Sequence, residues 1–146
     1  MDEEQSDQTL LKEYWAYQLY QQITPNSFKV HLVKIIYRNT NKPEESTEHF
    51  AFLIENNQEL ADRIGGEMVS RFGVTPTKID ETSYHQAMMF NYMIGNLDWN
   101  IMHQRNVKYI QKDTSSPLII VPYDFCLLYT SPSPRDATLS RMPSSA

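Results

Sequence analysis

The chain has 146 residues, of which 40% are hydrophobic and 21% charged, a balance typical of one globular domain rather than of a collagen-like or disordered chain. Its net charge of −5 disfavours nucleic-acid binding, which depends on neutralising phosphates. A single cysteine, Cys126, excludes an internal disulfide and a cysteine-rich zinc site. The sequence contains no apolar run of the roughly 18 residues that a membrane span needs. Its acidic N-terminus has no signal-peptide features, which leaves the compartment open.

The final segment differs in composition from the rest of the chain. From Cys126 it reads CLLYTSPSPRDATLSRMPSSA. Ser and Pro are frequent in it, and its hydrophobic residues show neither helical nor strand periodicity. The run CLLYTSPSPRD resembles the translation of a sequencing adapter. We therefore interpret residues 126–146 as a non-native tail and residues 1–125 as the domain. The alternative is a natural Ser/Pro-rich disordered tail.

The first predicted element is a helix over Gln8–Ile23. Leu11, Trp15 and Leu19 recur at i, i+4 and i+8, the spacing of one helical face. We expect this face, widened by neighbouring tyrosines, to pack in the core. Pro25 follows the helix and is typical of a helix end.

Two strands and a short helix are expected next. Phe28–Tyr37 and His49–Glu55 are rich in Val, Ile and Phe, as strands are. A polar loop separates them, so we expect an antiparallel hairpin with a long connection. Asn57–Ile64 is predicted to be a helix that ends at Gly65-Gly66.

The strongest helical pattern is Ser83–Ile94. Asp80 or Thr82 is placed to cap its N-terminus, and Gly95 follows its last turn. Apolar residues cover most of its circumference, which predicts a buried helix.

Two short strands, Asn106–Gln111 and Leu118–Val121, are expected to form a second hairpin. The order of helix, two strands, helices and a short hairpin is typical of an α+β fold, because a parallel α/β sheet would alternate strands and helices.

Three polar residues stand at the ends of these elements. Asp98 follows the strongest helix, Asn106 opens the second hairpin and Asp124 closes it. A hairpin brings its ends together, so we expect the three side chains to converge. Carboxylate and amide oxygens are the ligands that Mg²⁺ accepts. The alternative is that Asp98 and Asp124 serve only as turn or cap residues.

The segments FNYMIGNLDW, RNVKYI and LIIVPYDF resemble the catalytic core of atypical protein-kinase-like phosphotransferases, including the CotH, HipA and secretory-pathway kinases. EYWAYQLYQQITPNSFKVHLVKIIY and MIGNLDW resemble a group of bacterial, Bacteroidetes-type proteins of this kind. The likeness covers Leu10–Phe125. It implies a partial protein-kinase-like fold, with the end of an N-lobe and the start of a C-lobe.

The resemblance also implies roles for individual residues. Asp98 would accept the proton of the substrate hydroxyl, and Asn106 and Asp124 would bind Mg²⁺. Glu13 would be the glutamate of the N-lobe helix, and Glu55 would lie at the hinge, where backbone groups hold adenine. The function so implied for the full-length protein is transfer of phosphate from ATP, with Mg²⁺, to a hydroxyl of a protein or small molecule.

The sequence departs from the kinase pattern at several points. Asn106 lies eight residues after Asp98, whereas kinases place the asparagine five residues after the aspartate, so Asn100 is a second candidate. No glycine-rich phosphate loop is present. The resemblance would place the ATP-anchoring lysine upstream of Met1 and the rest of the C-lobe downstream of Phe125, which predicts an inactive chain.

Two further alternatives remain open. Glu13 is also explained as a solvated helix residue. The whole domain is also explained as a non-catalytic, kinase-like binding or scaffold module.

Overall fold

The fold is described by a computed structural model, which describes residues 3–42, 44 and 46–126. Most of the tail predicted for residues 126–146 lies outside these residues. The elements in chain order are α1 (Glu3–Ile23), β1 (Val30–Arg38), β2 (Ser46–Ile54), α2 (Asn57–Ile64), β3 (Glu67–Val69), a short 3-10 helix η1 (Pro76–Lys78), α3 (Glu81–Met93), β4 (Val107–Gln111) and β5 (Ile119–Pro122).

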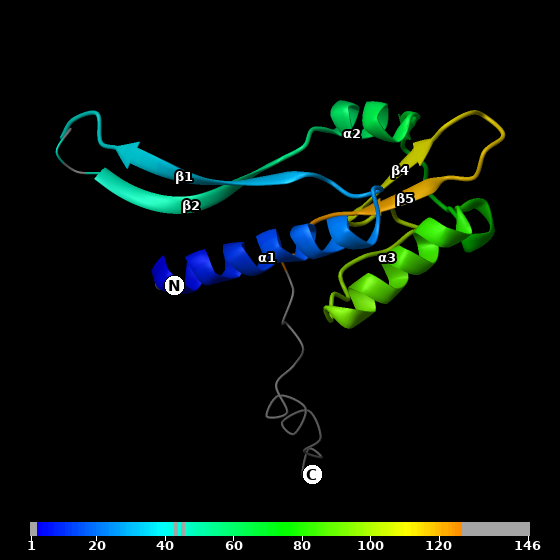
Figure 1. Ribbon diagram of the computed structural model, residues 1–146, viewed down its shortest axis with the longest axis horizontal. Helices are drawn as coiled ribbons and strands as arrows, with labels where there is room; N and C mark the ends of the chain where they lie inside the picture. Colours follow the sequence, from blue (N-terminus) through cyan, green and yellow to red (C-terminus); the bar gives the residue numbers. More distant parts are fainter. Residues whose placement is uncertain (1–2, 43, 45, 127–146) are drawn as a thin grey trace, which may run out of the picture.

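The strands form two antiparallel sheets, and the expected α+β class is confirmed. β1 and β2 make a long hairpin that extends away from the body, while β3, β4 and β5 pair in that order within it (Figure 1). α1 runs beneath the hairpin, and α3 packs against β5. No helix in the described part of the chain is both long and apolar enough to span a bilayer.

Local signals predicted several element ends correctly. α2 covers the predicted residues, with the Asn56 side chain accepting from the Glu59 amide and Gly65 in the left-handed region at φ 79°. Asp80, rather than Thr82, caps α3, because its side chain accepts from the Ser83 amide at 2.8 Å. These ends depend on short-range hydrogen bonds, which a sequence pattern can reveal.

The strand β5 is buried along its whole length because alternate residues face two different cores. Ile119 and Val121 contribute to one hydrophobic cluster with α1 and Phe125. Leu118, which precedes the strand, and Ile120 contribute to a second cluster. A strand covered on both faces is continuously apolar, as the sequence LIIV is.

Aromatic rings at the centre of the first cluster join α1 to α3. The Tyr20 ring lies 4.7 Å from that of Phe90, and Phe125 lies 4.8 Å from Tyr17 and 5.5 Å from Phe90. Phe125 and Tyr20 are fully buried. Phe125 is therefore held between the two helices, directly after Asp124.

The predicted buried face of α1 was wrong. Trp15 and Leu19 are 60% and 53% exposed, and the residues that α1 buries are Ala16, Tyr17 and Tyr20. The face is selected by contact with Phe90 and Phe125, which lie far away in sequence.

The prediction that α3 is buried on all sides was also wrong. Met89 and Tyr92 are 62% and 82% exposed, because only one side of the helix meets the body. The buried side consists of Ser83, Ala87, Phe90 and Asn91. With Ile23, the exposed side lines an apolar hollow of about 570 Å³.

Candidate functional site

Asp98 and Asn106 are brought together, as predicted from the sequence. The Asn106 side-chain amide donates to the Asp98 backbone oxygen at 2.6 Å and to its carboxylate Oδ2 at 3.2 Å. Because the amide nitrogen of Asn106 is used in this way, its Oδ1 is the atom that remains to accept a donor or a cation.

Asn100, the other candidate asparagine, has a different role. Its side-chain oxygen accepts from the His103 amide at 2.9 Å, and its backbone pairs with that of Arg105. It shapes the turn between α3 and β4. The structure therefore places Asn106, not Asn100, against Asp98.

Two buried asparagines that we did not single out in the sequence connect Asp98 to α3. The Asn91 side chain donates to the Ala87 carbonyl at 2.8 Å and accepts from the Asn96 side chain at 2.8 Å. Asn96 in turn accepts from the Asp98 amide at 3.1 Å. Such a fully satisfied amide chain fixes its members. An asparagine inside an apolar helix was the available sequence signal.

Arg105 lies beside the Asp98 carboxylate. Its Nη1 is 3.0 Å from Oδ1, and the two side chains are 65% and 34% exposed, respectively. A pair this exposed contributes little stability. Its chemical effect is to orient Asp98, whose other oxygen is held by Asn106.

Asp124 is connected to the same region through the backbone. The Tyr123 amide donates to the Asn106 carbonyl at 3.0 Å, so the residue before β4 and the residue after β5 are tied together. Asn106 and Asp124 both have a left-handed backbone, with φ of 52° and 59°. Asn and Asp tolerate this conformation best among the non-glycine residues.

α1 contacts the other side of Asp124. The Tyr17 hydroxyl accepts from the Asp124 amide at 2.8 Å. Burial and the nearby Asp124 carboxylate raise the pKa of Glu13, although a hydrogen bond from the Phe125 amide opposes the shift. Glu13 is thus half-buried beside a second carboxylate, so the alternative of a fully solvated helix residue does not describe it.

The position of Glu13 predicts a gain in stability when its charge is removed. In Glu13→Gln, the free energy of unfolding at neutral pH should rise by less than about 1 kcal/mol, since the raised pKa marks a carboxylate that the folded state disfavours. Below the ordinary glutamate pKa of about 4.3 the gain should vanish, because Glu13 is then protonated in both states. Urea unfolding at the two pH values measures this, with the exposed Glu67→Gln as control. A loss of stability at neutral pH would contradict it.

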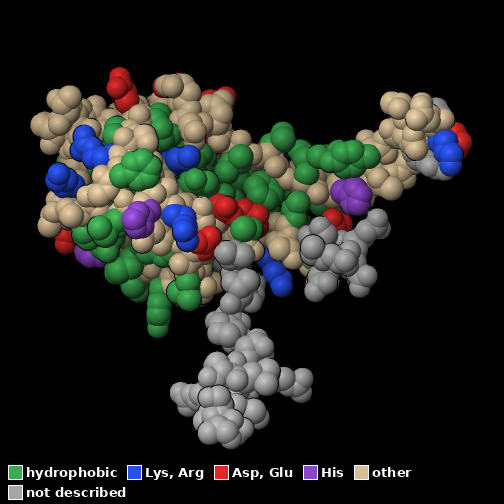
Figure 2. Space-filling view, turned by 180° about the vertical axis from the view of Figure 1, so that it is seen from behind, with side chains coloured by type: hydrophobic (Ala, Val, Ile, Leu, Met, Phe, Trp, Pro, Cys, Tyr) green, Lys and Arg blue, Asp and Glu red, His purple; other side chains and the backbone are tan. Residues whose placement is uncertain are grey.

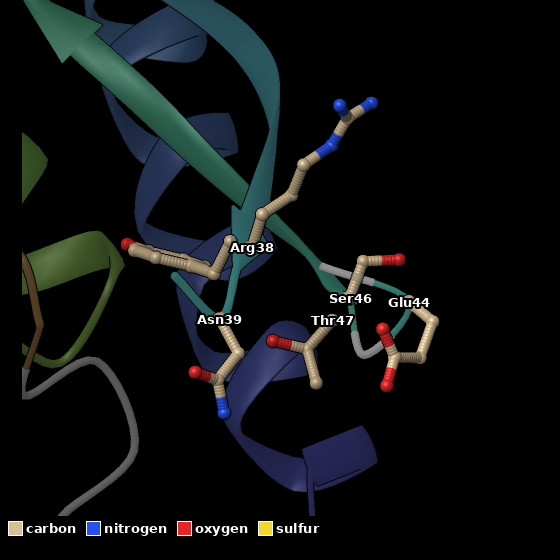
Figure 3. A pocket seen from close by; sticks show the side chains of 6 residues that line it. Arg38, Asn39, Glu44, Ser46 and Thr47 are labelled. Carbon is tan, nitrogen blue, oxygen red and sulfur yellow. The ribbon is translucent and has the colours of Figure 1, made fainter. Parts of the chain in front are cut away.

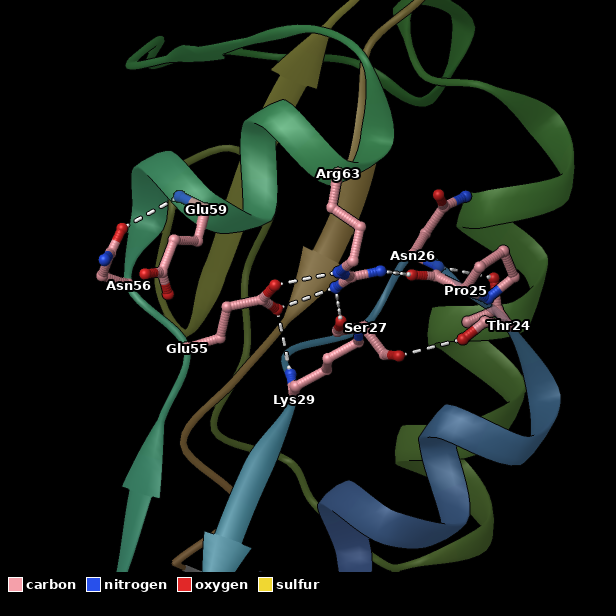
Figure 4. A network of polar contacts seen from close by, with 9 residues as sticks. All are labelled: Thr24, Pro25, Asn26, Ser27, Lys29, Glu55, Asn56, Glu59 and Arg63. Atoms are coloured by element: carbon pink, nitrogen blue, oxygen red, sulfur yellow. Dashed lines mark hydrogen bonds and ion pairs between the residues drawn. The ribbon is translucent and has the colours of Figure 1, made fainter.

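Glu55 has a structural partner. Arg63 of α2 binds its carboxylate through Nε at 2.9 Å and Nη2 at 2.8 Å, and the Lys29 amide donates to it at 3.1 Å (Figure 4). The Glu55 amide donates to the Lys29 carbonyl at 2.8 Å. Burial alone would raise the pKa of Glu55, but the bonds from Arg63 and Lys29 and their positive charges hold it below its usual value.

Arg63 extends this network to the loop after α1. Its Nη1 donates to the Pro25 carbonyl at 2.7 Å and its Nη2 to the Ser27 carbonyl at 2.6 Å (Figure 4). The carboxylate and amide of Glu55 are therefore used to join β2, α2 and the end of α1. Its side chain is not available for a nucleotide.

The site residues do not include a preformed cluster of metal-binding side chains. Within residues 3–42, 44 and 46–126, no group of three or more His, Cys, Asp or Glu side chains is placed to hold an ion. The cation ligands available near Asp98 are therefore an amide oxygen and single carboxylates. Such a set suits a metal that brings further oxygens, as Mg²⁺ does with phosphates and water.

A hollow of about 640 Å³ lies elsewhere, at the tip of the β1–β2 hairpin (Figure 3). It is lined by Tyr37, Arg38, Asn39, Glu44, Ser46 and Thr47. None of the predicted site residues contributes to it. The side chains of Asp98 and Asn106 meet, and Asp124 is linked to Asn106 through the Tyr123 amide, so these three residues define the candidate site.

No protein-family model, no curated protein and no solved structure matches this chain.

Proposed function

We infer that the domain is part of a phosphotransferase that uses ATP and Mg²⁺ to phosphorylate a hydroxyl group. The observation that carries this proposal is the Asn106 side chain, whose amide nitrogen holds both the carbonyl and the carboxylate of Asp98 and leaves its oxygen for a cation. A base and a metal ligand are thereby fixed beside each other by one side chain.

Each residue has a defined task in this reaction. Asp98, with one carboxylate oxygen on Arg105 and the other on Asn106, is oriented to accept the proton of an acceptor hydroxyl. Asn106 and Asp124 offer an amide oxygen and a carboxylate from the two ends of the β4–β5 hairpin. Magnesium–ATP would supply the phosphoryl group and the cation that neutralises its charge.

Positioning supports the same proposal, because phosphoryl transfer depends on geometry and charge more than on covalent catalysis. The Asn91–Asn96 chain holds Asp98 from α3, and the Tyr17 hydroxyl holds the Asp124 amide from α1. The Asp98 and Asp124 backbones are therefore supported by two different helices. These bonds favour a positioned site over a pair of isolated turn residues.

The proposal is tested by magnesium-dependent nucleotide binding to the full chain, measured by calorimetry with a non-hydrolysable ATP analogue. Because the resemblance places the ATP-anchoring lysine outside this chain, we expect weak binding that requires Mg²⁺ and is lost in Asp124→Asn and in Asn106→Ala. Asp113→Asn, at an exposed turn carboxylate, is the control and should bind as the unmodified chain does. Binding that is absent, or that is indifferent to Asp124 and Asn106, would contradict the proposal and favour the non-catalytic alternative.

A further inference from the structure

The β1–β2 hairpin is a two-stranded sheet that extends from the body (Figures 1 and 2). Its strands pair from Val30↔Ile54 to Arg38↔Ser46. In the part of the chain that the structure describes, no third strand pairs with either edge. Two-stranded sheets are marginal unless another strand or helix supports them, so the edges of this hairpin are candidates for a partner.

The register shows which backbone groups of β2 face outward. The Glu55 amide donates to the Lys29 carbonyl at 2.8 Å, one step beyond the Val30↔Ile54 pair. Hydrogen-bonded and non-hydrogen-bonded pairs alternate along an antiparallel ladder. The odd-numbered residues of β2 therefore bond to β1, and the N–H and C=O groups of the even-numbered ones, including Phe50 and Phe52, point away from it.

Side chains along β2 are apolar on both faces of the sheet. Phe52 packs toward α1, with its ring 5.6 Å from Tyr17. Phe50 lies on the same face and is 41% exposed, whereas Leu53 lies on the opposite face and is 63% exposed. A strand that is apolar on both faces is typical of the interior of a sheet. Here it lies at an edge.

The edge of β1 is less suited to pairing. The Gln18 side chain donates to the Val30 carbonyl at 3.4 Å, so α1 occupies the start of this edge. Lys34 and Arg38 lie along the rest, and charged residues discourage strand addition. β2 carries one acidic residue, Glu48, which is already paired with Lys34.

We propose that β2 pairs antiparallel with β2 of a second copy of this chain, about a two-fold axis at Phe50, to form a four-stranded sheet. In this register the outward-facing groups of the two strands match, and Phe50 lies opposite its own counterpart. Glu48 lies opposite Phe52 of the other copy, so no like charges meet. The cross-strand pair of Phe50 rings at the axis would add to the stability of the contact.

Analytical ultracentrifugation of the full chain, from low micromolar to near-millimolar concentration, tests the proposal. We expect reversible dimerisation that Phe50→Glu weakens about tenfold or more. Two glutamates would then meet at the axis, whereas within each hairpin the new carboxylate lies opposite Lys34 and is tolerated. Ile36→Lys is the matched control, since Ile36 is 50% exposed on the same face of β1 and lies opposite Glu48. It should dimerise normally.

Amide hydrogen exchange locates the contact independently of the variants. The Phe50 and Phe52 amides should become protected as concentration rises, while the Ala51 and Leu53 amides, which bond to β1, are protected throughout. A monomer at every concentration would overturn the proposal. A dimer in which the Phe50 and Phe52 amides stay unprotected would overturn it equally, because the contact would lie elsewhere.

Discussion

Replacing Arg63 by alanine is expected to lower the free energy of unfolding by about 2–4 kcal/mol. The substitution leaves the Glu55 carboxylate, whose side chain is 8% exposed, without its charged partner. It also removes the donors to the Pro25 and Ser27 carbonyls. We expect a smaller loss of stability than for a fully buried ion pair because the Arg63 side chain is 25% exposed. Urea unfolding followed by circular dichroism measures it.

Two comparisons separate this role from a general effect of losing an arginine. Arg71→Ala removes an exposed arginine and should change stability by less than about 0.5 kcal/mol. The double variant Glu55→Gln/Arg63→Ala should be destabilised by less than the sum of the single variants, since the residues form one network. Equal effects of Arg63→Ala and Arg71→Ala would contradict the account.

The same ion pair predicts how stability depends on pH. The pKa of Glu55 is lowered in the folded state, so its contribution is complete above the unfolded-state pKa and is lost as the pH falls through the lower folded-state value. Arg63→Ala should therefore lose part of the acid sensitivity of the unmodified chain.

Phe125→Ala is expected to cost about 3–5 kcal/mol, the range for deleting a large, well-packed aromatic side chain. Phe125 is fully buried, and its ring meets Tyr17 and Phe90 edge-on, so truncation leaves a cavity between α1 and α3. Phe72→Ala is the matched control, because Phe72 is 75% exposed and should be nearly neutral. Denaturant midpoints of the two variants measure the difference.

Removing the Phe125 ring should also affect the candidate site. Phe125 follows Asp124, whose amide is held by the Tyr17 hydroxyl. If the ring anchors this segment, the Asp124 amide should exchange faster with solvent in Phe125→Ala than in a variant of similar stability in the second cluster, such as Leu118→Ala. An unchanged Asp124 amide would show that the ring stabilises the core without positioning the site.

Most of the element order could be predicted from the sequence because it depends on short-range signals, but β3 and η1 were not predicted. The apolar runs of the two hairpins and the capping residues Asp80 and Gly65 are local in sequence. The faces of α1 and α3 could not be predicted in this way. Tyr17 meets a residue 107 positions away, and no periodicity within α1 reveals which face that contact selects.

The contact between Asn106 and Asp98 was predicted from the sequence, but the contacts that support the two residues were not. A hairpin necessarily brings its ends together, which is why Asn106 and Asp124 were expected near Asp98. The Arg63 network depends on contacts between elements far apart in sequence. The Asn91–Asn96 chain is local, and the asparagine inside an apolar helix was the signal that we did not use. For Glu55, the resemblance to kinases implied a hinge, while the structure shows its carboxylate bound to Arg63.

The central claim is that Asp98, Asn106 and Asp124 form one cation-dependent site, and manganese titration of the ¹⁵N-labelled full chain tests it most directly. With an ATP analogue present, we expect Mn²⁺ to broaden first the amide signals at Asp98, Asn106 and Asp124, and Asp124→Asn to abolish this. Broadening that begins elsewhere, or that persists unchanged in Asp124→Asn, would contradict the account.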